Sequence, residues 1–140
     1  CRLMVIPQLD TLRVNQLLVL NLSNNQLQAV GRELSLLTSI RSLDLSRNRI
    51  QSLGDWLGSL STLTNLNLMY NQFQRLPCEI CELTALVSLG LRNNLLTELP
   101  DQIGDLENLV HLFLTDNQLT TLPVSVSRMK SLRKIQGSHN

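Results

Sequence analysis

An asparagine recurs at a constant interval of 23 residues through most of this 140-residue chain. The five positions are Asn25, Asn48, Asn71, Asn94 and Asn117, and one further step reaches Asn140. Self-similarity at a fixed period of about 20 to 50 residues is the signature of stacked repeats, in which each repeat forms one structural unit. The interval therefore predicts a repeat array and argues against an irregular globular domain.

Aliphatic residues keep the same register as the asparagines. Residues 17–27 spell L-x-x-L-x-L-x-x-N-x-L, and the pattern starts again at residues 40, 63, 86 and 109. A second pattern, L-P-x-x-I-x-x-L-x-x-L, starts at Leu76 and Leu99, and a variant of it starts at Leu122. The L-x-L alternation predicts a strand with its leucines on one face. Apolar residues at every third position suit a 3₁₀ or loosely helical arm.

The recurring asparagine has a structural explanation. An inward-pointing amide can both donate and accept hydrogen bonds. We expect Asn25, Asn48, Asn71, Asn94 and Asn117 to form a ladder that satisfies turn backbone groups of each coil and its neighbour.

These motifs resemble the leucine-rich repeat family over residues 15–140, and more narrowly its 23-residue intracellular class, found in ras-suppressor-like and Ras-pathway scaffold proteins. The resemblance implies an α/β solenoid, a curved horseshoe segment. Parallel strands would line its concave face, and 3₁₀ or irregular helical arms its convex face. It also implies a signalling scaffold or adaptor that binds a folded protein partner, such as a small GTPase or a phosphatase. The alternative is the recognition arm of a multidomain enzyme, such as a ubiquitin ligase, a Roco-type kinase or an adenylate cyclase.

The register predicts a single repeat array over residues 1–140. Residues 1–14 form a partial repeat, 15–131 about five repeats, and 132–140 a second partial repeat. Gly137 stands where the register calls for Leu, which removes one core side chain. Because the chain starts without Met and ends within a repeat, we expect it to be a fragment of a longer protein.

Composition excludes several classes of function. The net charge of +1 and the lack of a basic run argue against nucleic acid as a partner. No apolar stretch is long enough to cross a bilayer, so membrane insertion is not expected. Three cysteines without framework spacing indicate a reducing, cytoplasmic compartment. No catalytic constellation, cofactor motif or metal site is present, so we expect the protein not to be an enzyme.

The residues between the inward leucines should build the functional surface. On the concave face we expect a partner-binding centre of Arg47, Met69, Tyr70, Arg92, His111 and Phe113 at outward strand positions. Tyr, Phe, Met and Arg are enriched in protein interfaces. Phe113 should lie beside Gly90, leaving a shallow gap next to an exposed ring.

Two other features have simpler interpretations. Cys78 and Cys81 have the spacing of half a zinc site or a redox pair, but no second pair exists, and the register gives both to variable positions of the convex arm that flank Ile80. Trp56 is expected to pack across adjacent convex arms, although it offers a possible second contact site.

Overall fold

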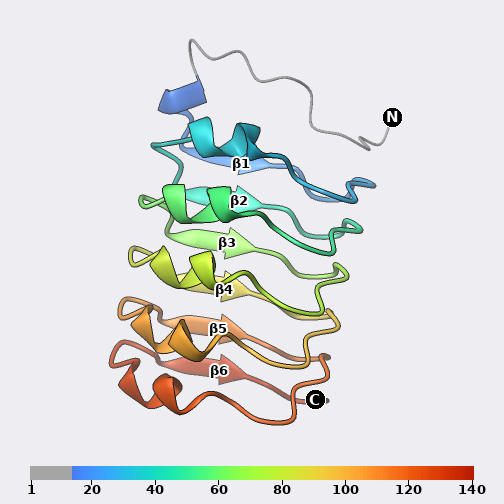
Figure 1. The fold of residues 1–140 in the computed structure, drawn as a ribbon, viewed down its shortest axis with the longest axis vertical. Helices are drawn as coiled ribbons and strands as arrows, with labels where there is room; N and C mark the ends of the chain where they lie inside the picture. Colours follow the sequence, from blue (N-terminus) through green and yellow to red (C-terminus); the bar gives the residue numbers. More distant parts are fainter. Residues whose placement is uncertain (1–13) are drawn as a thin grey trace.

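The computed structural model describes residues 14–140 as a succession of similar coils stacked along one axis, from β1 at the top of Figure 1 to β6 at the bottom. The predicted partial repeat at 1–14 lies outside the described residues except for Val14. The strands pair in chain order as one parallel sheet: β1 (Val19–Asn21), β2 (Ser42–Asp44), β3 (Asn65–Asn67), β4 (Ser88–Gly90), β5 (His111–Phe113) and β6 (Lys134–Gln136). The other side carries the 3₁₀ helices: η1 (Val14–Gln16), η2 (Arg32–Leu36), η3 (Asp55–Ser59), η4 (Cys78–Glu82), η5 (Asp101–Asp105) and η6 (Val124–Arg128). The predicted α/β solenoid is confirmed.

Strand pairing follows the 23-residue period without any slip. Leu43 of β2 pairs with Leu66 of β3, and Leu66 pairs in turn with Leu89 of β4. The parallel ladder extends past the short strands, because the amide of Leu45 donates to the carbonyl of Asn67 at 2.9 Å. A shift of one residue would turn every core leucine outward, so the leucine pattern itself fixes the register.

The convex arms are 3₁₀ because their apolar residues recur at every third position. In and just after η3, the amides of Leu57, Leu60 and Leu63 each donate a hydrogen bond to the carbonyl of the residue three positions before, at 2.9–3.2 Å. A 3₁₀ helix has about three residues per turn, so these side chains lie along one inward edge. Gly54 or Pro77 occupies the position before the helix, where an extended backbone begins the arm.

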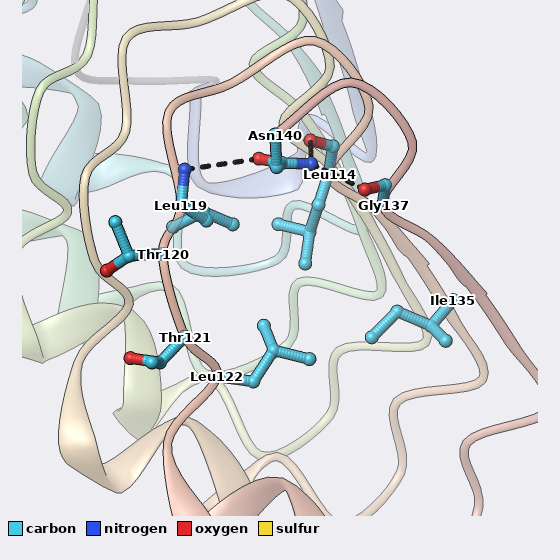
Figure 2. Close-up of a pocket in the computed structure, with 8 residues that line it drawn as sticks. All are labelled: Leu114, Leu119, Thr120, Thr121, Leu122, Ile135, Gly137 and Asn140. Carbon is cyan, nitrogen blue, oxygen red and sulfur yellow. Dashed lines mark hydrogen bonds between the residues drawn. The ribbon is translucent and has the colours of Figure 1, made fainter.

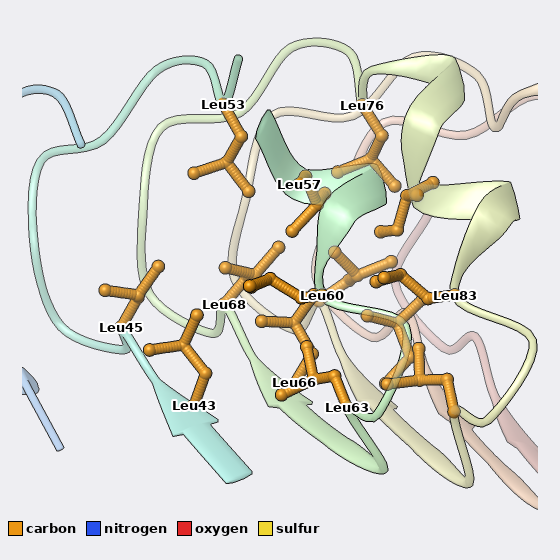
Figure 3. Close-up of a cluster of buried hydrophobic side chains, with 14 of the residues drawn as sticks. Leu43, Leu45, Leu53, Leu57, Leu60, Leu63, Leu66, Leu68, Leu76 and Leu83 are labelled. Carbon is orange, nitrogen blue, oxygen red and sulfur yellow. The ribbon is translucent and has the colours of Figure 1, made fainter. Parts of the chain in front are cut away.

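The core lies between the sheet and the arms and runs along the stack. Figure 3 shows part of it. Leu43, Leu66 and Leu89 enter it from the strands, and Leu60 and Leu83 from the arms; each is 2% exposed or less. Burial of such a side chain contributes about 1.5–3 kcal/mol, and only the adjacent coil can provide the cover. Stability therefore depends on contacts between neighbours along the array.

The recurring asparagines join consecutive coils. The amide nitrogen of Asn71 donates to Leu68 O at 3.1 Å in its own coil and to Leu45 O at 3.0 Å in the preceding coil. Its amide oxygen accepts the backbone N–H of Ile50 at 3.0 Å. The same pattern is repeated by Asn48, Asn94, Asn117 and Asn140.

The last described coil is less well covered than the others. Leu122 and Ile135 are 45% and 43% exposed. Together with Gly137 they line a hollow of about 280 Å³ beside Leu114 and Leu119 (Figure 2). A Cβ on Gly137 would meet only Asn140, at 3.8 Å, so the missing leucine side chain leaves open space.

Replacing Asn71 with Leu should destabilise the array. The change leaves the carbonyls of Leu45 and Leu68 and the amide of Ile50 without their partner, at a cost of roughly 1–3 kcal/mol for each buried group. Urea unfolding would measure the loss in the free energy of unfolding. Asn65→Leu is the matched control, because this exposed strand residue makes the same chemical change with an expected effect within about 0.5 kcal/mol. Equal loss of stability in both variants would contradict a structural role for the ladder.

Candidate interaction surface

The strand side of the solenoid displays side chains that the core does not use. In β2, Ser42 and Asp44 face outward and are half-buried, whereas Leu43 between them is buried. We call this surface the concave ribbon. It comprises each strand with its flanking residues, that is 18–24, 41–47, 64–70, 87–93, 110–116 and 133–139.

The structure divides the six predicted contact residues between two places. His111 and Phe113 lie in β5, at outward strand positions. Arg47, Met69 and Arg92 do not lie in strands, and neither does Tyr70: all four belong to the turns that follow β2, β3 and β4. The expectation of strand positions was wrong for these four residues. Each strand ends after three residues, because the chain then turns so that the side chain of the ladder asparagine points into the solenoid.

The residue before each ladder asparagine has a left-handed backbone. The values of φ are 53–58° at Asn24, Arg47, Tyr70, Asn93, Asp116 and His139. Asn and Asp adopt this conformation readily, whereas for other residues with a Cβ it costs roughly 1–2 kcal/mol. Sequence reasoning missed this feature, although Asn or Asp at three equivalent positions was a usable signal. Arg47 and Tyr70 are thus held in a strained conformation that the fold more commonly gives to Asn.

Arg47 and Tyr70 contact each other across adjacent coils. The guanidinium carbon of Arg47 lies 4.4 Å from the centre of the Tyr70 ring. Such a cation–π pair contributes about 0.5–1 kcal/mol at an exposed site. Because the two residues occupy equivalent register positions, the period brings them together, and they form a polar-aromatic edge next to the strands.

A second aromatic group lies on β5. The rings of His111 and Phe113 stack with their centres 6.1 Å apart and their planes at 9°. Nζ of Lys134 in β6 lies 5.6 Å from the centre of the Phe113 ring. The contact of Lys134 was not foreseen from the sequence, because the register pairs Lys134 with His111 and does not say where the Lys134 side chain points.

A hollow of about 260 Å³ opens on the ribbon beside this aromatic group. Gly90 pairs with Phe113, as the period predicted, and both line the hollow together with Met69 and Asn67. A Cβ at Gly90 would come within 2.8 Å of Cε of Met69 and 3.1 Å of Oδ1 of Asn67. Gly90 has no positive φ, so its contribution is space, not backbone freedom.

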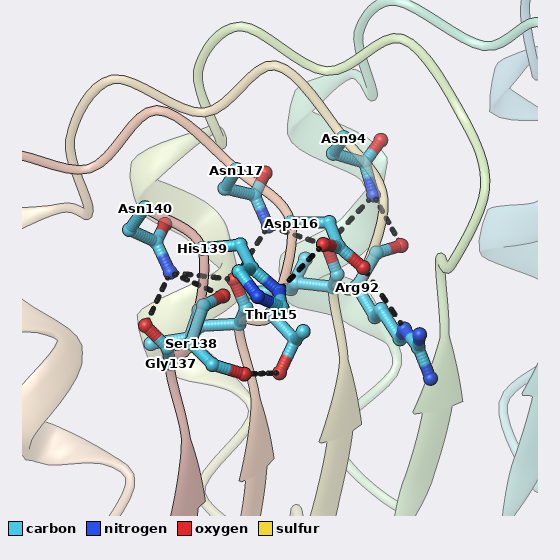
Figure 4. A network of polar contacts seen from close by, with 11 residues as sticks. Arg92, Asn94, Thr115, Asp116, Asn117, Gly137, Ser138, His139 and Asn140 are labelled. Atoms are coloured by element: carbon cyan, nitrogen blue, oxygen red, sulfur yellow. Dashed lines mark hydrogen bonds and ion pairs between the residues drawn. The ribbon is translucent and has the colours of Figure 1, made fainter.

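Arg92 belongs to a polar network at the end of the turns (Figure 4). Its Nε lies 3.3 Å from Oδ2 of Asp116, whose Oδ1 lies 3.3 Å from Nδ1 of His139. Thr115 and Ser138 share a further contact of 3.5 Å in the same place. Asp116 and His139 were not among the predicted site residues. A spacing of one period plus one residue, from Arg92 to Asp116, was the available signal.

The convex side contains the two cysteines and the tryptophan. Cys78 is exposed, whereas Cys81 is buried and belongs to the core, although both stand at variable positions of the register. Trp56 is 6% exposed and packs in the core from η3. Among residues 14–140, no group of three or more His, Cys, Asp or Glu side chains could hold a metal ion. No helix within the same range is long and apolar enough to span a membrane.

Comparison with known proteins places the repeats in a family. The family model described as leucine rich repeat matches residues 15–73, 38–96 and 84–140, which together cover most of the chain. No curated protein gives a significant match.

Solved structures share the fold at substantial sequence identity. A leucine-rich repeat protein of Leptospira interrogans is 36% identical, with a TM-score of 0.85, over 88% of this chain and 31% of its own. The ectodomain of the membrane receptor kinase GASSHO1/SCHENGEN3 from Arabidopsis thaliana, solved in complex with Casparian strip integrity factor 2, is 32% identical, with a TM-score of 0.77. That match covers 90% of this chain and 16% of the ectodomain. The chain thus spans less than a third of either protein.

The two cysteines should differ sharply in reactivity. Burial, helped by the nearby Asp105 carboxylate, raises the pKa of Cys81 from 9.0 to about 12. The thiolate is the reactive form. In a Cys1→Ser background, a disulfide-exchange reagent should therefore modify Cys78 in the folded protein and Cys81 only after unfolding. Equal rates in the folded protein would contradict this assignment.

The same raised pKa of Cys81 makes stability depend on pH. The unfolded chain loses the thiol proton at lower pH than the folded chain does. Burial of the protonated Cys81 thiol therefore contributes fully to the free energy of unfolding below about pH 9. This contribution is lost as the pH rises towards 12. In the Cys81→Ala variant, the free energy of unfolding, measured by urea at each pH, should lack this fall over the same range. An equal fall in both proteins would contradict the assignment.

Proposed function

The chain belongs to the leucine-rich repeat family, whose repeats generally mediate protein–protein interaction, and we propose that it binds a protein partner on the concave ribbon. The centre of the contact is formed by Arg47, Met69, Tyr70, Arg92, His111 and Phe113. The core and the asparagine ladder use none of these side chains, so they are available to a partner.

The strained conformation of Tyr70 gives the strongest support. Asn stands at the equivalent place in two other coils and adopts the left-handed backbone at little cost. The cation–π contact with Arg47 offsets only part of the strain on the two residues. Strained residues of this kind cluster at functional sites, and a binding role accounts for Tyr70 where packing alone does not.

The narrower role is part of the proposal. We infer a signalling scaffold or adaptor in the cytoplasm, with a small GTPase or a phosphatase as partner, on the basis of the resemblance to the ras-suppressor-like class. The cysteines, which lack the spacing of a disulfide framework, are the sequence feature that supports a reducing compartment.

The alternative is that the array is the recognition arm of a larger enzyme. It is favoured by the similarity to the ectodomain of a receptor kinase, a protein in which repeats and a catalytic activity occur together. The two roles differ in whether the full-length polypeptide also contains a catalytic domain. Sequencing the complete coding region separates them, since a kinase, ligase or cyclase domain would support the enzyme.

A double variant, Tyr70→Asn with Phe113→Asn, tests the ribbon. Both changes install residues that the fold already uses at the same register positions, Asn93 and Asn67. The melting temperature should therefore change little, whereas loss of both rings should remove a partner that the unchanged protein captures from a cell lysate. Quantitative mass spectrometry of the captured proteins would measure this.

The matched control is Leu36→Ala with Val124→Ala. These side chains are 42% and 89% exposed and lie in η2 and η6 on the convex side. Capture should survive in the control. A partner lost from the control and retained by the ribbon variant would place the contact on the convex arms and refute the proposal.

A further inference from the structure

Charge is distributed unevenly between the two sides of the described solenoid. The concave ribbon has five basic residues, Arg41, Arg47, Arg92, Arg133 and Lys134, against two acidic ones, Asp44 and Asp116. The remaining described residues have the opposite balance. Their acidic residues are Glu33, Asp55, Glu79, Glu82, Glu98, Asp101, Asp105 and Glu107, and their basic ones are Arg32, Arg49, Arg75, Arg128 and Lys130. The small net charge of the chain therefore conceals a positive ribbon and a negative convex side.

The two carboxylates of the ribbon are already engaged. Asp116 contacts Arg92 and His139, and Oδ1 of Asp44 accepts the backbone N–H of Ser46 at 2.9 Å. Within residues 14–140, neither Arg41 nor Lys134 forms an ion pair. Unpaired cations on an interaction surface favour a partner that supplies negative charge.

The unpaired cations lie on both sides of the hollow. Arg41 immediately precedes β2, at one end of the hollow, and Lys134 lies in β6, beyond Phe113 at the other end. Four strand spacings of about 4.8 Å separate β2 from β6, or about 19 Å. An extended polypeptide covers this distance with about six residues, at roughly 3.3 Å each.

The hollow between them suits an uncharged side chain. Phe113 and Met69 offer apolar contact, and Ser42, Asn65 and Ser88 offer hydroxyl and amide groups. Asp44 also lines the hollow, so a carboxylate of the partner would be repelled there and an uncharged side chain is favoured. Such a mixture of apolar walls with a few polar groups is typical of a site that receives one side chain of a ligand.

We propose that the concave ribbon binds an extended acidic segment of a protein partner, which crosses the strands from β2 to β6. Its carboxylates, about six residues apart, contact Arg41 at one end and Lys134 at the other. An uncharged side chain between them enters the hollow over Gly90. The inference rests on the proposed function and adds the chemistry of the partner to it.

The observations favour a polypeptide over nucleic acid. A nucleic-acid site requires a dense basic patch, commonly with a pI above about 9. The sequence pI here is about 8.0, and the ribbon includes two carboxylates among its five basic residues. Few unpaired cations spread over several strands match isolated carboxylates better than a continuous row of phosphates.

The test uses a synthetic peptide whose two terminal Glu residues lie about six positions apart. The stretch between them is neutral and consists of Ser, Asn and Leu. A peptide with Lys in place of each Glu is the comparison, and oligouridine tests nucleic acid. Binding is followed by chemical-shift changes of the full isotope-labelled chain, which detect weak complexes. The Glu peptide should shift signals of the ribbon, and its affinity should fall as salt is added.

Charge reversal locates the contact. Arg41→Glu with Lys134→Glu should weaken binding of the Glu peptide about tenfold or more. Arg32→Glu with Lys130→Glu changes the net charge by the same amount on the convex side and should leave the affinity within about twofold. Gly90→Asn places in the hollow the residue that β3 has at Asn67. The new side chain requires the Met69 side chain and the Asn67 amide to shift, fills part of the hollow, and should also weaken binding.

Several results would overturn the inference. These are equal or tighter binding of the Lys peptide, tighter binding of oligouridine, an equal effect of the two charge reversals, no effect of Gly90→Asn, or no shift with any peptide. Its failure is distinguishable from failure of the proposed function. If a captured partner depends on Tyr70 and Phe113 but not on Arg41 and Lys134, the ribbon binds proteins without requiring acidic ones. If capture depends on neither pair, both proposals are wrong.

Discussion

The side-chain amide of one asparagine per coil connects the backbone of each coil to the next. Its nitrogen has two hydrogens, and its oxygen can accept, so a single group bonds to carbonyls of two coils and to an N–H of the preceding one. Aspartate has no hydrogen to donate, and leucine has neither function. The turns expose these backbone groups inside the solenoid, where leaving them unpaired would be costly. The ladder therefore requires an asparagine at the same register position of every coil, as the core requires the leucines.

A second consequence of the ladder is the shape of the display surface. To point the asparagine inward, each coil ends its strand after three residues and takes up a left-handed backbone at the residue before the asparagine. That residue projects from the edge of the ribbon. Where it is Asn or Asp the conformation is relaxed, and where it is Arg47 or Tyr70 the fold holds a large side chain at some cost. Scaffold and display are therefore separate sets of residues on the same coil.

The amino-acid sequence predicts the fold well because its main determinants are periodic. Alternation of leucines gives the strands, three-residue spacing gives the 3₁₀ arms, and equal intervals give the pairing of Gly90 with Phe113. The turn positions of Met69 and Arg92 were not predicted, since the length of a strand depends on where the ladder bends the chain. The burial of Cys81 also escaped prediction, because its spacing from Cys78 does not say which face of a short 3₁₀ helix enters the core. Contacts such as that of Lys134 with Phe113 depend on side-chain conformations that a register does not determine.

The account separates a scaffold, which holds the coils together, from a ribbon, which meets the partner. Amide hydrogen exchange of the full chain, with and without a captured partner, tests that separation most directly. The account predicts that the partner slows amide exchange within residues 41–47, 64–70, 87–93 and 110–116 and leaves exchange in η2 to η6 unchanged. Slower exchange across the convex arms, with no change in these four segments, would contradict it.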